Sequence, residues 1–162
     1  MGNVDIKTRL ATREDILQIV NLLADDELGS KRESFTDPLA NGYIQAFKKI
    51  QSSPDNELIV MEHNGEVIGC MQLTFIPYLT FQGGSRCQIE GVRISSKHRG
   101  CGIGGKMFLY AIEKSKGRGC HMIQLTTNKD RVNTHKFYEK LGFKATHEGF
   151  KLYLNNKVET GK

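Results

Sequence analysis

The beginning of the chain has the pattern of a strand followed by two helices. Residues 4–10 alternate between apolar and polar side chains, which predicts a strand. Thr12 and Asp15 have the spacing of a capping box and precede apolar residues at helical spacing, so a helix is expected to begin there. A second helix is expected to begin near Asp37 and Pro38, because proline fits the first helical position.

From residue 57 onward the pattern changes to strands. Two apolar segments, 57–63 and 66–76, flank Asn64 and Gly65. This pair predicts a tight hairpin because both turn positions tolerate positive φ. A further strand is expected over residues 86–94, directly before a glycine-rich loop.

After this loop the pattern predicts two helices and three strands. The helix that follows the loop should extend to about residue 117, and Gly142 stands where a left-handed glycine commonly ends a helix. The remaining elements are expected, in order, as a strand at 121–127, a helix at 131–141 and strands at 143–148 and 150–154.

This order of elements predicts the α+β class. We expect a mixed, mostly antiparallel sheet of about seven strands, flanked by about four helices. The sequence has neither a linker nor an internal repeat, so residues 1–155 are expected to form a single domain and residues 156–162 a disordered tail.

Charge and cysteine usage narrow the classes of function. The net charge of +5 favours an anionic partner, which a phosphorylated cofactor satisfies as well as nucleic acid does. Since no aromatic stacking motif accompanies the lysines, the sequence argues against nucleic acid. The four cysteines show no C-x-x-C spacing, which argues against a metal site and fits a reducing compartment. Without an apolar leader or a membrane-length apolar segment, a cytoplasmic protein that does not enter the membrane is expected.

The stretch HRGCGIGGKM, residues 98–107, fits three different phosphate-binding patterns. A dinucleotide fingerprint requires its first glycine directly after a strand, but SSKHR separates Gly100 from the apolar strand. A nucleotide P-loop requires Ser or Thr after the lysine, where this chain has Met107. The third pattern, R-x-x-G-x-G, needs no metal, because main-chain N–H groups at a helix start hold the anion.

Two longer segments resemble one known family. IEGVRISSKHRGCGIGGKMF (89–108) and TNKDRVNTHKFYEKLGF (127–143) are similar to the two principal motifs of the GNAT (Gcn5-related N-acetyltransferase) superfamily. The chain departs from the usual motifs at Cys101, where Lys, Gln or Arg is common, and at Arg131, where many members carry Asn. The resemblance implies that acetyl-CoA enters between two splayed strands and donates its acetyl group to an amine in a ternary complex. A non-catalytic acyl-CoA sensor is the alternative.

The resemblance also implies which residues hold acetyl-CoA. The strand before the loop would pair with pantetheine, with the Val92 N–H polarising the thioester, and the loop would hold the pyrophosphate. Gly91 would permit a bulge that opens the sheet, or simply be a small residue that the strand tolerates. The expected contact residues are Val92, Arg93, Ile94, Arg99, Gly100, Cys101, Gly102, Ile103, Gly104, Gly105, Lys106, Asn128, Asn133 and Tyr138.

Glu90 and Tyr138 are the candidate catalytic residues. Glu90 is expected to act as general base, directly or through a water, because burial in an apolar strand would make it a stronger base. The alternative is a structural role for Glu90, bound to Arg86, Arg93 or main chain. Tyr138 is expected to donate a proton to the departing sulfur, or else to be a core tyrosine beside Phe137.

The acceptor is expected to be a small-molecule or peptide amine. In similar proteins the first two helices and the loop between the third and fourth strands shape the acceptor pocket. In this chain these correspond to the polar segment 25–35 and to a loop that contains Tyr78 and Phe81. Exposed strands near the end of the chain are compatible with a homodimer.

Overall fold

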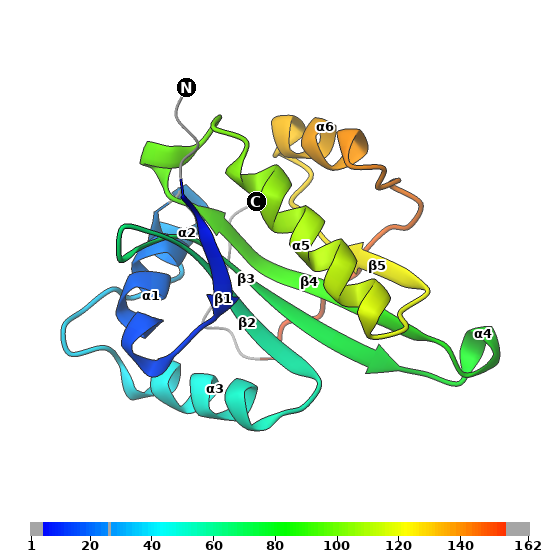
Figure 1. Cartoon of the computed structure of the whole chain (residues 1–162), viewed down its shortest axis with the longest axis horizontal. Coiled ribbons are helices and arrows are strands. Elements are labelled where there is room, and N and C mark those ends of the chain that lie inside the picture. Colours follow the sequence, from blue (N-terminus) through cyan, green and yellow to red (C-terminus); the bar gives the residue numbers. More distant parts are fainter. Residues whose placement is uncertain (1–4, 26, 155–162) are drawn as a thin grey trace. The chain divides into compact units, whose positions relative to one another are not determined.

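A computed structural model describes residues 5–25 and 27–154 of the chain. The chain forms two compact units, residues 1–125 and 126–162. The first unit holds a sheet of five strands in the order β1-β2-β3-β4-β5 (Figure 1). Neighbouring strands are antiparallel except for β4 and β5, which are parallel. The predicted α+β class, with a mixed and mostly antiparallel sheet, is therefore confirmed.

The elements follow the expected order along the chain (Figure 1). The strands are β1 (Lys7–Leu10), β2 (Asn56–His63), β3 (Glu66–Pro77), β4 (Ser85–Ile94) and β5 (Met122–Leu125). The longer helices are α1 (Ile16–Ala24), α3 (Asn41–Ser52), α5 (Ile103–Gly117) and α6 (Val132–Lys140). Single helical turns form α2 (Glu27–Ser30) and α4 (Thr80–Gly83), and 3-10 turns cover Arg13–Asp15 and Ser96–His98.

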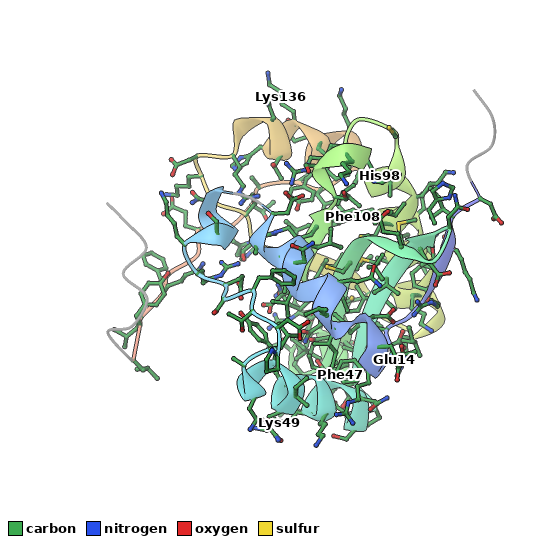
Figure 2. The ribbon with its side chains drawn as sticks, turned by 90° about the vertical axis from the view of Figure 1, so that its left-hand side faces the viewer. Glu14, Phe47, Lys49, His98, Phe108 and Lys136 are labelled. Atoms are coloured by element: carbon green, nitrogen blue, oxygen red, sulfur yellow. The ribbon has the colours of Figure 1, made fainter. Side chains whose placement is uncertain are left out.

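Helices cover both faces of the sheet in the first unit. Successive residues of a strand point to opposite faces. Cys70 of β3 packs in a buried cluster with Ile19 and Leu22 of α1. At the neighbouring Gly69, an added Cβ would lie only 2.8 Å from the Met107 side chain of α5, so α1 and α5 lie on opposite faces. Phe47 of α3 and Phe108 of α5, labelled in Figure 2, are both buried.

Among the described residues the sheet has five strands instead of about seven, because the two final expected strands do not form. Residues 143–148 and 150–154 contain no strand in the described part of the chain. Phe150, Leu152 and Leu154 are 93%, 86% and 86% exposed, so their alternating pattern meets no surface that would bury it. An isolated pair of strands is only marginally stable in water, which accounts for the difference. The expected disordered tail lies outside the described residues, and the extent of the domain stays a prediction.

The second helix begins later than the sequence predicts. Asp37 and Pro38 lie in a bend joined by a cis peptide bond, and α3 begins only at Asn41. Ala40, directly before the helix, has an extended ψ of 136°. The preference of proline for the first helical position therefore predicts a helix start that is three residues too early. The local signal of the β2–β3 turn is confirmed: Asn64 and Gly65 have φ of 50° and 79°.

An ion-pair network ties the first strand to the first helix. The Arg9 guanidinium donates hydrogen bonds to Asp15 at 2.6 and 2.9 Å and to Glu62 of β2 at 2.7 Å. The Asp15 carboxylate also accepts the Thr12 N–H at 2.7 Å, as the capping-box pattern predicts. Asp15 is only 4% exposed. The hydrogen bonds from Arg9 hold the pKa of Asp15 below its usual value, although burial opposes this shift.

We expect Asp15→Asn to lower the free energy of unfolding at pH 7 by about 2 kcal/mol, because it leaves a partly buried guanidinium without one carboxylate. The pKa of Asp15 is lowered by folding, so its contribution is present above the unfolded-state pKa and is lost as pH falls through the folded-state pKa. The difference between variant and wild type should therefore shrink below about pH 4. Urea unfolding at pH 7 and pH 3 measures this, with the exposed Glu66→Gln as control. An equal loss at both pH values would contradict the assignment.

Candidate active site

A bulge interrupts β4 at Gly91. In the pairing of β3 with β4, Cys70 lies opposite Arg93 but Gln72 lies opposite Glu90, so β4 carries one extra residue at this point. Gly91 has a φ of +60°, in the left-handed region that glycine adopts without strain. The structure thus places the bulge at the glycine that the sequence singled out.

The sheet opens next to this bulge. The parallel pairing of β4 with β5 covers only Arg86–Ile89 and Met122–Leu125. Strand β4 continues past this paired region to Ile94, whereas β5 ends at Leu125. The main chain of Val92, Arg93 and Ile94 therefore lies beyond the last β4–β5 pair, where an extended ligand can lie along it as an added strand.

The glycine-rich loop leads directly into α5. Gly100 and Gly102 have φ of 78° and 77°, and Gly102 is the residue that precedes the first helical position. The first hydrogen bond of the helix runs from the Lys106 N–H to the Gly102 carbonyl at 3.2 Å. The three preceding N–H groups, of Ile103, Gly104 and Gly105, belong to the first helical turn, where N–H groups have no partner within the helix. Such a helix start is suited to bind phosphate.

The side chains of the loop divide between the interior and the surface. Ile103 is 4% exposed and anchors the start of α5 in the core. Cys101 and Lys106 are exposed, and His98 is half-buried just before the loop (Figure 2). The Cys101 thiol donates to the Arg99 carbonyl at 3.7 Å. Gly100 and Gly102 are exposed, so the main chain of the loop is accessible at these two positions.

The Arg99 side chain bonds to protein carbonyls. Its Nε donates to the Ile94 carbonyl at 3.1 Å and its Nη2 to the Asp25 carbonyl at 2.9 Å. The sequence predicts that the Arg99 cation contacts the phosphate. It does not predict the hydrogen bond from Arg99 to Asp25, which lies 74 positions away. Asp25 also accepts the Ser96 N–H at 2.9 Å. No local signal identifies these partners, because they depend on how α1 packs on the sheet.

Glu90 lies at the open end of the paired region, and its side chain is exposed. The expectation that this carboxylate is buried in the strand is wrong. The reason is that successive strand residues point to opposite faces of the sheet: Ile89 points to the buried face, whereas Glu90 lies on the face of its half-buried polar partner Gln72. An exposed carboxylate next to the Gly91 bulge remains accessible to an acceptor or to a water.

Tyr78 and Phe81 gather at the other end of β4. The Tyr78 hydroxyl lies 2.8 Å from Nε2 of His121, and the Phe81 ring centroid is 4.8 Å from the His121 ring. Their loop precedes Ser85, five residues before Glu90, which corresponds to about 16 Å along an extended strand. The structure does not bring these two aromatic residues to the opening beside Gly91, because the hairpin loop and the bulge lie at different positions along β4.

The second unit carries Asn128, Asn133 and Tyr138. The Asn128 side chain accepts the Asp130 N–H at 3.0 Å, in the turn before α6. Asn133 is exposed on α6, whereas Tyr138 is half-buried between Phe137 and Phe143, with ring centroids at 5.5 and 6.0 Å. As expected, α6 ends just before Gly142, whose φ is +89°.

The described part of the chain offers neither a metal site nor a membrane-spanning helix. Within residues 5–25 and 27–154, no group of three or more His, Cys, Asp and Glu side chains is arranged to hold a metal ion. Among the helices of the same part of the chain, none has the length and apolar character needed to cross a membrane.

The fold and the site define an α+β protein in which a glycine-rich helix start follows the end of β4 that extends beyond its pairing with β5. The model of the acetyltransferase (GNAT) family matches residues 17–143. The chain therefore belongs to this family, and the resemblance of its two motifs is confirmed.

The chain is similar to two curated N-acetyltransferases. A glucosamine 6-phosphate N-acetyltransferase of Trypanosoma brucei brucei is 31% identical over 90 residues, which cover 56% of this chain and 59% of the relative. An aminoalkylphosphonate N-acetyltransferase of Salmonella typhimurium is 29% identical over 87 residues, 54% of this chain and 56% of the relative. The match thus spans less than two thirds of the length of either relative.

Among solved structures, one from Bacillus halodurans C-125 resembles the whole chain. It is 52% identical, with a TM-score of 0.90, and the match covers 92% of this chain and 99% of that one. That protein is described as a transcriptional regulator. An acetyltransferase of Trypanosoma brucei is 25% identical with a TM-score of 0.76, over 93% of this chain and 100% of that one.

Proposed function

We propose that the protein is an N-acetyltransferase that transfers the acetyl group of acetyl-CoA to a primary amine of a small molecule or peptide, by direct attack in a ternary complex. The observation that carries the proposal is the opening between β4 and β5 next to the helix start at Gly102. Membership of the acetyltransferase family and the names of the two curated relatives support it.

The residues of the first unit suit the two polar parts of acetyl-CoA. The loop Gly100–Lys106 would hold the pyrophosphate through N–H groups at the start of α5, and Lys106 would add positive charge. The main chain of Val92, Arg93 and Ile94 would pair with the pantetheine amides. The Val92 N–H would then polarise the thioester carbonyl, as a single donor that stabilises the developing negative charge.

Acetyl transfer requires a neutral amine. An alkyl ammonium group has a pKa of about 10.4, so its deprotonation at pH 7 costs about 4.6 kcal/mol. Glu90 would take this proton, directly or through a water, from its exposed position beside the bulge. Tyr138 would donate a proton to the sulfur as the C–S bond breaks. The nitrogen would then lose its second proton, which restores the Tyr138 hydroxyl through solvent and leaves an acetamide and the CoA thiol. Asn128 and Asn133 would contact the pantetheine.

The names of the curated relatives guide the choice of acceptors to test. Glucosamine 6-phosphate and aminoalkylphosphonates each combine an amine with a phosphorus oxyanion. The net charge of +5 on this chain suits an acceptor with such a group. An amine panel should therefore contain matched pairs with and without a phosphate or phosphonate.

A non-catalytic acyl-CoA sensor is the second candidate function. It is favoured by the description of the 52% identical protein of Bacillus halodurans as a transcriptional regulator. Such a sensor would use the same loop and opened sheet without turning over an acceptor. A cytoplasmic location and a homodimer stay predictions for either function.

Thermal unfolding with acetyl-CoA, ATP–magnesium and NAD in parallel tests the proposed function. A ligand at about 100 times its dissociation constant should stabilise the folded state by about 2.7 kcal/mol. We expect acetyl-CoA alone to stabilise, and thiol release to follow with at least one amine of the panel. Stabilisation without thiol release on any amine would favour the sensor. Stabilisation by a nucleotide alone would contradict both candidates.

A further inference from the structure

The end of α1 contacts the bulge of β4 and the segment that leads into the glycine-rich loop, at three points. Leu23 lies 4.0 Å from the position that a Cβ would take on Gly91, at the bulge. The Asp25 carboxylate accepts the Ser96 N–H at 2.9 Å, in the 3-10 turn that leads into the loop. The Asp25 carbonyl accepts a hydrogen bond from Arg99, the first residue of the R-x-x-G-x-G pattern.

Arg99 completes this connection. Its planar guanidinium reaches the Ile94 carbonyl at the end of β4 with one nitrogen and the Asp25 carbonyl with another, at 3.1 and 2.9 Å. Its Nη2 also lies 3.7 Å from the Asp25 carboxylate. A cation at the C-terminal end of a helix is further favoured by the helix dipole. Arg99 and Asp25 thus form a brace between α1, the end of β4 and the loop.

Given the proposed function, we propose that Asp25 and Arg99 are positioning residues that couple the cofactor loop to the acceptor side of the site. The chain runs from Asp25 into segment 27–36, which contains most of the polar segment 25–35 that the family resemblance places at the acceptor. An anion bound at Gly100–Lys106 would hold the loop in one conformation. Because the brace connects the loop to the end of α1, segment 27–36 would also become less mobile. Because coupling between two sites is reciprocal, a bound acceptor would also strengthen binding of acetyl-CoA.

A direct role of Arg99 on the pyrophosphate makes different predictions. A lysine at this position would keep the positive charge and can still bind phosphate. A single ammonium group lacks the rigid fork that spans the two carbonyls. Arg99→Lys therefore removes the brace but retains charge near the loop. Asp25→Ala removes the carboxylate that accepts the Ser96 N–H and changes no cation.

Hydrogen exchange of the full chain, with and without saturating acetyl-CoA, separates the two roles. We expect acetyl-CoA to slow exchange in loop 99–106 of the wild type and to slow it about tenfold in segment 27–36. In Arg99→Lys and Asp25→Ala the protection of the loop should persist while that of segment 27–36 is lost. Arg99→Lys removes the fork that reaches the Asp25 and Ile94 carbonyls, and Asp25→Ala removes the hydrogen bond from the Ser96 N–H. Because the brace needs both contacts, the double variant should lose no more protection than either single variant. Lys97→Ala, which removes an exposed cation of the same turn, should behave like the wild type.

The outcomes are distinct. If acetyl-CoA still protects segment 27–36 in both variants, the proposed role of the brace is wrong. Loss of loop protection in Arg99→Lys alone would overturn it in favour of direct contact with the pyrophosphate. A wild type in which acetyl-CoA protects the loop but leaves segment 27–36 unchanged would also overturn it, without affecting the proposed function. A loop that acetyl-CoA does not protect at all would contradict the proposed function itself.

Discussion

Glu90→Gln is expected to lower the turnover number about 100-fold and to leave the affinity for acetyl-CoA unchanged. The substitution keeps the size of the side chain but removes the group that accepts the proton of the amine, and a positioned general base typically contributes about 10²–10⁴ in rate. Glu90 is exposed beside the bulge, so the substitution should not disturb the core. Thiol release gives the turnover number, and thermal shift with acetyl-CoA reports its binding.

Two further variants show whether the effect belongs to Glu90. Glu113→Gln changes another exposed carboxylate, on α5, and should retain full activity. Tyr138→Phe should also lower turnover, by about tenfold, without unfolding the protein, because it removes the proton offered to the sulfur. If Glu90→Gln turns over as fast as the wild type, a structural role for this carboxylate is the better explanation. Unchanged turnover in Tyr138→Phe would leave this residue as a packing tyrosine between Phe137 and Phe143.

Gly102→Val is expected to weaken the binding of acetyl-CoA about 100-fold, which corresponds to about 2.8 kcal/mol. Gly102 has a φ of 77°, and a residue with a Cβ pays roughly 1–2 kcal/mol in this conformation, with a further penalty for a β-branched side chain. The loop must therefore distort, and the N–H groups of Ile103, Gly104 and Gly105 lose their common direction.

The structure separates this backbone effect from a steric one. No atom lies within 4 Å of a Cβ added at Gly102, so the valine would not be crowded by the protein. Gly117→Val is the matched control, because Gly117 lies at the other end of α5, with the same open surroundings and no positive φ. Titration with acetyl-CoA by calorimetry should show normal binding in the control. Normal binding in Gly102→Val would mean that the cofactor does not use this helix start.

The Glu90 and Gly102 variants also separate the two candidate functions. In an N-acetyltransferase, Glu90→Gln binds acetyl-CoA but fails in turnover, whereas Gly102→Val fails in both. In a sensor that releases no thiol, only the loop variant changes a measurable property. The two variants change separate parts of the site: Glu90→Gln changes the carboxylate beside the bulge, and Gly102→Val changes the backbone conformation before α5.

The sequence determined those parts of the protein that depend on neighbouring residues. Positive φ at Asn64 and Gly65 follows from the turn that joins two adjacent strands. The hydrogen bond between Thr12 and Asp15 and the end of α6 before Gly142 are also local, as is the glycine-rich start of α5. In each case the residue type sets the backbone conformation over a few positions, so the local sequence pattern is sufficient to predict the feature.

The tertiary structure decided the features that depend on distant segments. Glu90 is exposed because it lies on the face of the sheet opposite to that of buried Ile89, and the sequence of β4 alone does not show which face is covered at this point. The partner of Arg99 is Asp25 because α1 packs beside the loop from 74 positions away. Residues 150–154 have the apolar–polar alternation of a strand but form none. Alternation makes a segment compatible with a strand, but a strand forms only where it can pair with the edge of another strand. Residue types thus set what each segment can form, and long-range packing decides which of these possibilities is realised.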